Sequence, residues 1–271
     1  MTSLALSFTG PGSVLPVAAG AVLVLMLVVW LVSIRLQDVS IIDPVWGPAL
    51  ALVGVVAALV GNGDSARRWL LAAMVVAWGA RLGVHLAIRK AHEGEEDRRY
   101  AAMRAKHENF NAWSLIWIFG TQGLLVLVVA LPLQAAAQGS AALGLLVVPG
   151  VVVWAVGLAF ETIGDAQLRA FKADPENKGQ VMDRGLWRYT RHPNYFGDAC
   201  VWWGLWLVAL TAGGTWWTAV GPLVMTLLLV RVSGAGLLEK DIGDRRPGYK
   251  EYIERTSGFL PLPPRERKAP A

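Results

Sequence analysis

A stretch of 49 residues, from residue 112 to residue 160, contains no charged side chain. A helix needs about 20 apolar residues to cross the roughly 30 Å hydrocarbon core of a bilayer, so this stretch can cross twice. The chain is 55% hydrophobic and only 17% charged, whereas soluble domains usually carry about 25% charged residues. These features predict a membrane protein rather than a soluble domain.

Four other apolar stretches support this prediction. Residues 14–34 and 44–61 contain no charge, and residues 69–88 are interrupted only by Arg81 and His85. Residues 199–230 are also uncharged and long enough for two helices joined by a tight turn. The sequence therefore predicts an all-α, polytopic membrane bundle of about seven transmembrane helices.

The distribution of Lys and Arg predicts the orientation of this bundle. Basic residues fall on alternate loops, with only Arg67 and Arg68 on the other side. By the positive-inside rule, the N-terminus is expected outside and the C-terminus in the cytoplasm. Residues 1–262 are expected to form a single membrane domain, followed by a disordered, basic, Pro-rich tail at residues 263–271.

The loop after the fifth predicted helix carries the most informative polar residues. Glu161 and Asp165 are four residues apart and share a helix face, which Arg169 continues. That face is either a solvated extension of the helix or part of a binding site. Arg184, Arg188 and Arg191 follow, and Asn194 is a plausible N-cap for the next helix. A helix N-terminus flanked by Arg residues favours an anion such as phosphate.

Two tyrosines near the C-terminus allow two interpretations. Tyr249 and Tyr252 are three residues apart and can share a helix face. Their rings suit either the flat base of a nucleotide or the membrane interface. The chain has no dinucleotide-binding glycine motif, no P-loop and no H-E-x-x-H motif, so soluble nucleotide folds and zincins are unsupported. The four His residues are dispersed and Cys200 is the single cysteine, so no metal site is expected.

Ionisable residues inside predicted membrane helices are candidates for function. Arg81 and His85 lie one turn apart in the third predicted helix, and Asp43 begins the second. Asp43 is either a functional carboxylate or an ordinary helix cap.

Several motifs together resemble the steroid 5-alpha-reductase family. They are "RGLWRYTRHPNYFGDACVWWG", "SGAGLLEK" and "RRPGYKEYIERTSGFLP", and upstream "SIIDPVWG", "WGARLGVHL" and "EDRRYAAMR" resemble a bacterial branch of that family. The resemblance covers about residues 37–262. The core "RHPNYFGD" is similar to a broader group that includes sterol C14-reductases and isoprenylcysteine carboxyl methyltransferases.

The resemblance implies a membrane enzyme, here in a bacterial cytoplasmic membrane, that binds NADPH at its cytoplasmic side. It also implies reduction of a carbon–carbon double bond conjugated to a carbonyl, in a steroid-like, isoprenoid or fatty acyl lipid that enters from the bilayer. No nucleic acid or metal is expected. The expected cofactor-binding residues are Arg81, Arg98, Arg99, Asp165, Arg169, Lys172, Tyr189, Arg191, His192, Asn194, Tyr195, Asp198, Glu239 and Tyr249.

The catalytic positions of the animal steroid reductases are not reproduced. Those enzymes use a Gln–Glu pair near the start of helix 2 and a Tyr on helix 3. Here Ile42 and Asp43 take the places of the pair, Trp78 falls near the Tyr position, and the third predicted helix has no Tyr. Asp43 and His85 are therefore the candidates for the group that polarises the substrate carbonyl.

Two other functions remain open from the sequence. A methyltransferase that uses S-adenosylmethionine shares the "RHP-x-Y" core, but its cofactor has no phosphate to pair with the basic cluster. A non-catalytic membrane protein is the third possibility, because the Tyr of helix 3 is missing. The reductase is the interpretation that the motifs favour.

Overall fold

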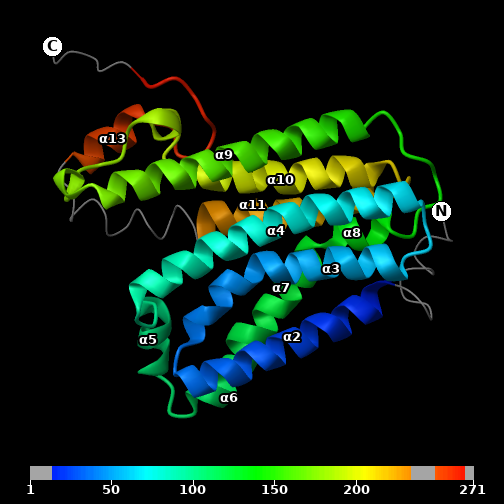
Figure 1. Cartoon of the computed structure of the whole chain (residues 1–271), viewed down its shortest axis with the longest axis horizontal. Coiled ribbons are helices and arrows are strands. Elements are labelled where there is room, and N and C mark those ends of the chain that lie inside the picture. Colours follow the sequence, from blue (N-terminus) through cyan, green and yellow to red (C-terminus); the bar gives the residue numbers. More distant parts are fainter. Residues whose placement is uncertain (1–13, 233–247, 266–271) are drawn as a thin grey trace. The chain divides into compact units, whose positions relative to one another are not determined.

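The computed structural model describes residues 14–232 and 248–265, and these residues are almost entirely helices, turns and loops (Figure 1). Within them no β-strand forms, and the only bridge of the β type joins Thr190 to Ser257. The prediction of an all-α membrane protein is confirmed. The chain divides into two compact units, one of residues 1–148 with 205–221 and one of residues 149–204 with 222–271.

The first unit consists of helices that follow one another with short connections. Asp38 caps the second of them, because its carboxylate accepts a hydrogen bond from the Ser40 backbone N–H. The elements are α2 (Val14–Leu36), η1 (Val39–Val45), α3 (Trp46–Val60), α4 (Ser65–Glu93), α5 (Arg98–Arg104), α6 (Phe110–Ser114), η2 (Leu115–Gly120), α7 (Thr121–Val129), α8 (Leu131–Ala136) and η5 (Trp216–Ala219).

The second unit is built on two long neighbouring helices. These are α9 (Val147–Ala173) and α10 (Pro193–Leu210). The last turns of α10, from Leu205, belong to the first unit. The other elements are η3 (Pro175–Asn177), η4 (Gly185–Arg188), α11 (Val220–Leu227), η6 (Leu228–Val232) and α13 (Tyr249–Arg255).

Five helical segments in the described part of the chain are long and apolar enough to cross a membrane. They are Val14–Leu36, Val39–Val60, Ser65–His92, Phe110–Val129 and Val147–Ala173. α10 and the shorter apolar segment Trp216–Arg231 stand where the sixth and seventh crossings were predicted. The fold is that of a multi-pass membrane protein, and the count of seven and the orientation stay predictions.

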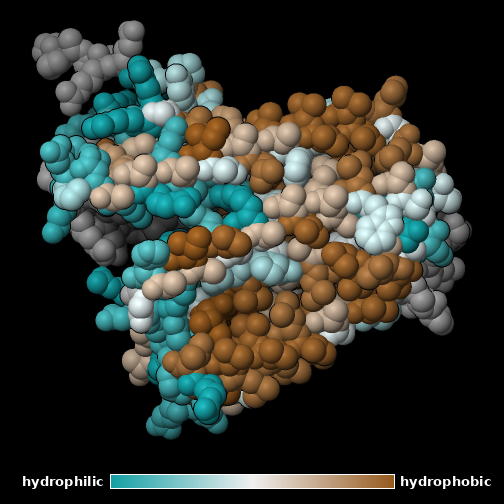
Figure 2. Space-filling view, in the orientation of Figure 1, coloured by the Kyte–Doolittle hydropathy of each residue, from teal (hydrophilic) through white to brown (hydrophobic). Residues whose placement is uncertain are grey.

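The surface of each unit matches this assignment. In the first unit, hydrophobic residues cover α2, whose exposed side chains include Leu23 and Leu31, and hydrophilic residues gather over α5 (Figure 2). In the second unit, the first half of α9 is hydrophobic outside, with Val148 and Val152 exposed, and the surface over α13 is hydrophilic. Large continuous apolar surfaces of this kind are typical of helices that face lipid.

Glycines let the helices approach closely within each unit. A Cβ atom on Gly47 of α3 would lie 2.4 Å from the Gly79 carbonyl oxygen of α4. A Cβ on Gly157 of α9 would lie 2.5 Å from the Gly197 carbonyl oxygen of α10. Lipid tails are as apolar as Leu side chains, so close backbone packing of this kind is a main source of helix association in membranes.

Arg67 and Arg68, the two basic residues on the unexpected side, have structural roles. Arg67 is fully buried, and its guanidinium donates to the carbonyl oxygens of Gly139 at 2.8 Å and Ala141, and to Thr211 Oγ1 at 2.9 Å. Arg68 donates to Ala58 at the end of α3. Arg68 thus satisfies a carbonyl that a helix end leaves without a partner, and Arg67 satisfies carbonyls of the connection after α8.

Some predicted boundaries were wrong. Helix α9 continues to Ala173, so Asp165, Arg169 and Lys172 lie on the helix and not in the loop. Asn194 is not the N-cap of α10, because the helix begins at Pro193 and the Phe196 N–H donates to the His192 carbonyl. Proline suits the first helical position, where no N–H is needed. Of the predicted disordered tail, only residues 263–265 fall within the described residues.

Candidate functional site

In the first unit, Asp43 of η1 lies in a cluster of polar side chains to which α3, α5 and α7 also contribute. The Tyr100 hydroxyl on α5 donates to Asp43 Oδ1 at 2.9 Å, and Gln122 Nε2 on α7 donates to the Tyr100 oxygen at 3.5 Å. Trp46 Nε1 donates in turn to Gln122 Oε1. Asp43 is therefore not a simple helix cap, since Asp38 has that role and the Asp43 carboxylate accepts from Tyr100.

Arg99 completes this cluster on its exposed side. Its guanidinium lies 3.3 Å from Asp43 Oδ2 and 2.9 Å from Asp97 Oδ1. Asp97 is also the N-cap of α5, since it accepts from the Arg99 backbone N–H at 2.9 Å. The cation at Arg99 is thus paired with two carboxylates.

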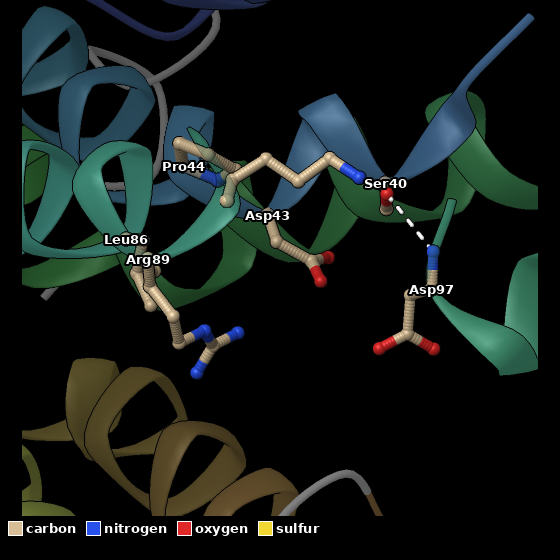
Figure 3. Close-up of a pocket in the computed structure, with 7 residues that line it drawn as sticks. Ser40, Asp43, Pro44, Leu86, Arg89 and Asp97 are labelled. Carbon is tan, nitrogen blue, oxygen red and sulfur yellow. Dashed lines mark hydrogen bonds between the residues drawn. The ribbon is translucent and has the colours of Figure 1, made fainter. Parts of the chain in front are cut away.

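Hydrogen bonds between segments far apart in the sequence hold the connection before α5 against η1. Glu96 accepts from the Val39 N–H at 2.9 Å and from Arg104 at 2.8 Å. Ser40 Oγ accepts from the Asp97 N–H at 3.2 Å (Figure 3). Because these contacts join residues 57 positions apart, they bring Tyr100 to Asp43.

A small pocket lies beside the cluster, with about 230 Å³ of empty space that is partly open to solvent. The side chains of Asp43 and Asp97 and the guanidinium of Arg89 extend into the same region in Figure 3. Its lining residues are Ser40, Asp43, Pro44, Leu86, Arg89, Lys90 and Asp97. The space that it leaves for a water-sized group is only about 10 Å³, about that of one water molecule, so it can take a single polar atom such as a carbonyl oxygen and not a whole ligand.

The surroundings shift the acidity of the groups on this side of the first unit. Burial, followed by the nearby Asp43 carboxylate, raises the pKa of Tyr100 well above its ordinary value. Tyr100 is therefore a protonated hydrogen-bond donor at neutral pH. Burial alone would raise the pKa of Asp97, but hydrogen bonds from Arg99 and its charge outweigh it and hold that pKa below its usual range. Hydrogen bonds from Lys90 and Ser40 likewise outweigh burial and lower the pKa of Asp38.

In the second unit, α9 and α10 enclose several of the predicted cofactor residues. Glu161 and Asp165 are 3% and 6% exposed, so their shared face points inward and is not a solvated extension. Asn194 Nδ2 donates to Asp165 Oδ1 at 3.2 Å across the two helices. His192 and Asp198 are also buried, and the His192 ring stacks on Tyr195 with centroids 5.3 Å apart.

Exposed arginines accompany this buried polar face. Arg169, Arg184 and Arg188 are exposed, and within the described residues they form no ion pair. The cations Lys90, Arg99 and Arg104 of the first unit, by contrast, are all paired with carboxylates. Arg169, Arg184 and Arg188 therefore have donors available for an anion.

The other predicted site residues are found in varied places. Arg81 and His85 are partly buried on α4, Arg98 is exposed on α5, and Lys172 and Tyr189 are exposed in the second unit. Tyr249 is buried in α13, with its ring 5.8 Å from that of Tyr252. Arg191 donates to the Thr256 and Ile253 carbonyls. Glu239 lies outside the described residues.

Sequence reasoning missed Tyr100 and Gln122. Tyr100 closes the motif "EDRRY", and Gln122 is one of two glutamines in the 112–134 stretch of the long apolar run. A polar residue in such a run is a hint of function, but its partner depends on the fold. Among the described residues, no group of three or more His, Cys, Asp or Glu side chains is placed to hold a metal ion.

The family model described as protein of unknown function, DUF1295, matches residues 29–256 of the chain. The chain belongs to the DUF1295 family. This DUF1295 protein thereby falls in the steroid 5-alpha-reductase-like superfamily, and its membrane-helical fold fits a membrane enzyme of the reductase-like or methyltransferase-like kind.

One curated relative is a probable O-methyltransferase, ustE, of Ustilaginoidea virens. It is 41% identical over 46 residues, which are 17% of this chain and 16% of the relative. The chain therefore matches only a small part of that protein's length. No solved structure matches the DUF1295 protein.

Proposed function

We propose that this DUF1295 protein is an NADPH-dependent reductase of a carbon–carbon double bond conjugated to a carbonyl in a lipid. The observation that carries the proposal is the contact between Tyr100 and Asp43, which places a buried phenol and a carboxylate beside a small polar pocket. Membership of the family and the membrane fold support the broader assignment as a membrane enzyme.

The residues of the second unit fit a phosphate-bearing cofactor. Arg169, Arg184 and Arg188 present guanidinium groups that make no ion pair within the described part of the chain. Guanidinium groups bind phosphate oxygens in a bidentate manner. The buried pair of Asp165 and Asn194 adds hydrogen-bonding groups of the kind that a ribose or an amide requires. We assign the arginines to the phosphates and the buried pair to the sugar or amide.

When bound, NADPH supplies the hydride that the β-carbon of the substrate receives. The chain's own residues then have to stabilise the negative charge that develops on the carbonyl oxygen. The Tyr100 phenol is protonated at neutral pH and can redirect its hydrogen bond from Asp43 to that oxygen. Gln122 and Asp43 hold the phenol oxygen in place.

The pocket beside Asp43 suits the carbonyl end of a lipid. It is small, its lining includes the polar side chains of Ser40, Asp43 and Asp97, and Leu86 and Pro44 supply its apolar contacts. The remainder of a steroid-like, isoprenoid or fatty acyl chain would stay in the bilayer. A bacterial cytoplasmic membrane is the proposed location, since the motifs resemble the bacterial branch.

A methyltransferase is the second candidate, because the ustE segment is 41% identical to part of this chain. S-adenosylmethionine carries one carboxylate and no phosphate, so it offers three arginines fewer anionic oxygens than NADPH does. Thermal unfolding of the detergent-purified protein separates the two. NADPH at 100 times its dissociation constant is expected to stabilise the fold by about 2.7 kcal/mol through mass action. A shift with S-adenosylmethionine and none with NADPH would contradict the proposal.

A further inference from the structure

The loop that carries Arg191 is held on one side by α9. Trp187 is buried, and its indole Nε1 donates to the Gly164 carbonyl at 3.0 Å. The Leu186 N–H donates to Gln167 Oε1 at 3.0 Å. Gly185 has a positive φ of 57°, which permits the turn that places these two contacts on the same helix.

The chain after α13 holds the same loop on its other side through backbone bonds. The Arg191 N–H donates to the Ser257 carbonyl at 2.9 Å, and the Leu262 N–H donates to the Tyr189 carbonyl at 3.0 Å. Thr190 Oγ1, which is fully buried, donates to the Phe259 carbonyl at 2.9 Å. Residues 189–191 and 257–262 are thus paired over three successive residues of the loop.

Two side chains strengthen this pairing. Tyr252 is 2% exposed, and its hydroxyl donates to the Trp187 carbonyl at 2.5 Å. Arg191 Nη1 donates to the Thr256 carbonyl at 2.7 Å and to the Ile253 carbonyl at 3.2 Å. These carbonyls lie at the C-terminal end of α13, where helices leave their last carbonyls without partners and favour a cation.

We infer that Arg191 and Tyr252 are positioning residues that fasten residues 252–262 to the loop at residues 185–191, and that Arg191 does not contact the cofactor phosphate. We call this set of bonds the tail contact. It sets the path of the chain between the exposed Arg188 and the start of α10 at Pro193. The effect on cofactor binding rests on the proposed function, whereas the tail contact itself does not.

The guanidinium of Arg191 supports this role by its surroundings. Nη1 already serves two carbonyls, and a Cβ atom added to Gly258 would lie 3.1 Å from Nη2. The guanidinium therefore packs against the chain after α13. Arg255 pairs with Asp183, which adds a charged contact between residues 252–262 and the chain just before the loop.

Hydrogen exchange of the purified protein without nucleotide tests the tail contact. Arg191→Ala is expected to speed exchange at least about tenfold for the Arg191 and Leu262 amides, because charged hydrogen bonds of this kind contribute appreciably. Arg191→Lys keeps a cation for the carbonyls and should retain most of the protection. Tyr252→Phe removes one hydroxyl without changing charge, so it should speed exchange of the same amides by a smaller factor. This variant keeps the test available if Arg191→Ala folds poorly. Unchanged exchange in Arg191→Ala and Tyr252→Phe would overturn the inference.

Nucleotide affinity provides the second readout. Arg191→Ala is expected to weaken NADPH and NADH by the same factor, about tenfold, because the loop and not a phosphate contact is disturbed. A loss for NADPH alone, with unchanged exchange, would assign Arg191 to the 2′-phosphate and overturn the inference. If the wild-type protein binds neither nucleotide, the proposed function is wrong. The comparison of hydrogen exchange without nucleotide would still show whether the tail contact exists.

Discussion

The phenol of Tyr100 donates a 2.9 Å hydrogen bond to the carboxylate of Asp43, across 57 positions of the chain. Tyr100 comes from the short helix α5, and the third predicted helix, in which the animal steroid reductases carry their Tyr, has none. In this protein the tyrosine that contacts the acid therefore comes from α5 and not from the third predicted helix.

Replacing Tyr100 by Phe tests this pair. The substitution removes the donor and keeps the ring, so we expect the rate of lipid reduction to fall about 100-fold or more, as for loss of a positioned donor. NADPH affinity should stay within about twofold. Glu108→Gln is the control, because Glu108 is exposed in the connection before α6 and belongs to neither the cluster nor the pocket lining. Equal rates for wild type and Tyr100→Phe would remove Tyr100 from the reaction.

Arg188 differs from Arg191 in having its guanidinium available for a phosphate. It is exposed and forms no ion pair within the described residues. We assign Arg188 to the 2′-phosphate, which NADH lacks, so Arg188→Ala is expected to weaken NADPH binding by about tenfold, since charge-assisted bonds to phosphate are strong, while NADH binding changes little. Lys106→Ala, an exposed cation of the first unit, should leave both affinities unchanged. Isothermal titration with the two nucleotides measures this, and an equal loss for both would contradict it.

Close packing between α9 and α10 predicts a stability effect. A Cβ at Gly157 would lie 2.5 Å from the Gly197 carbonyl, whereas one at Gly20 would meet nothing within 4 Å. Gly157→Ala should therefore lower the melting temperature, because the backbones must separate. Gly20→Ala should be neutral or slightly stabilising, by up to about 1 kcal/mol from helix propensity. A melting temperature for Gly157→Ala equal to that of Gly20→Ala would show that the helices are not so close.

The pKa values of Asp38 and Asp97 predict how stability depends on pH. Both are held below the usual range, so these groups contribute stability that is fully present above the unfolded value of about 3.9 and is lost as the pH falls through the folded value. Asp38→Asn should make the decline below about pH 4 shallower than in the wild type. Thermal unfolding at a series of pH values measures this decline in stability. A steeper decline in Asp38→Asn than in the wild type would contradict the prediction that ionised Asp38 stabilises the fold.

The sequence predicted the large features well because they depend on local composition. The uncharged runs correspond to five membrane-length helices, since a bilayer demands about 20 apolar residues wherever a helix crosses. The four-residue spacing of Glu161 and Asp165 also predicted a shared helix face, and both are buried on α9.

The finer features depended on contacts that no spacing reveals. Asn194 has the residue type of an N-cap, but Pro193 fits the first helical position better and places Asn194 inside α10. Arg191 belongs to a basic cluster, yet α13, about 60 residues later, supplies its carbonyl partners. Tyr100 likewise reaches Asp43 only because Glu96 and Asp97 hold the preceding connection on η1.

The most direct test of the reductase uses NADPH that carries deuterium at the hydride position. The purified protein is incubated with this cofactor, with S-adenosylmethionine labelled in its methyl group and with lipids extracted from a strain that lacks the gene, and the lipids are examined by mass spectrometry. The account predicts a lipid that has gained one deuterium from the cofactor and one hydrogen from water, in a product missing from the Tyr100→Phe reaction. A lipid that instead gains a labelled methyl group from S-adenosylmethionine, with no deuterium transfer from NADPH, would contradict it.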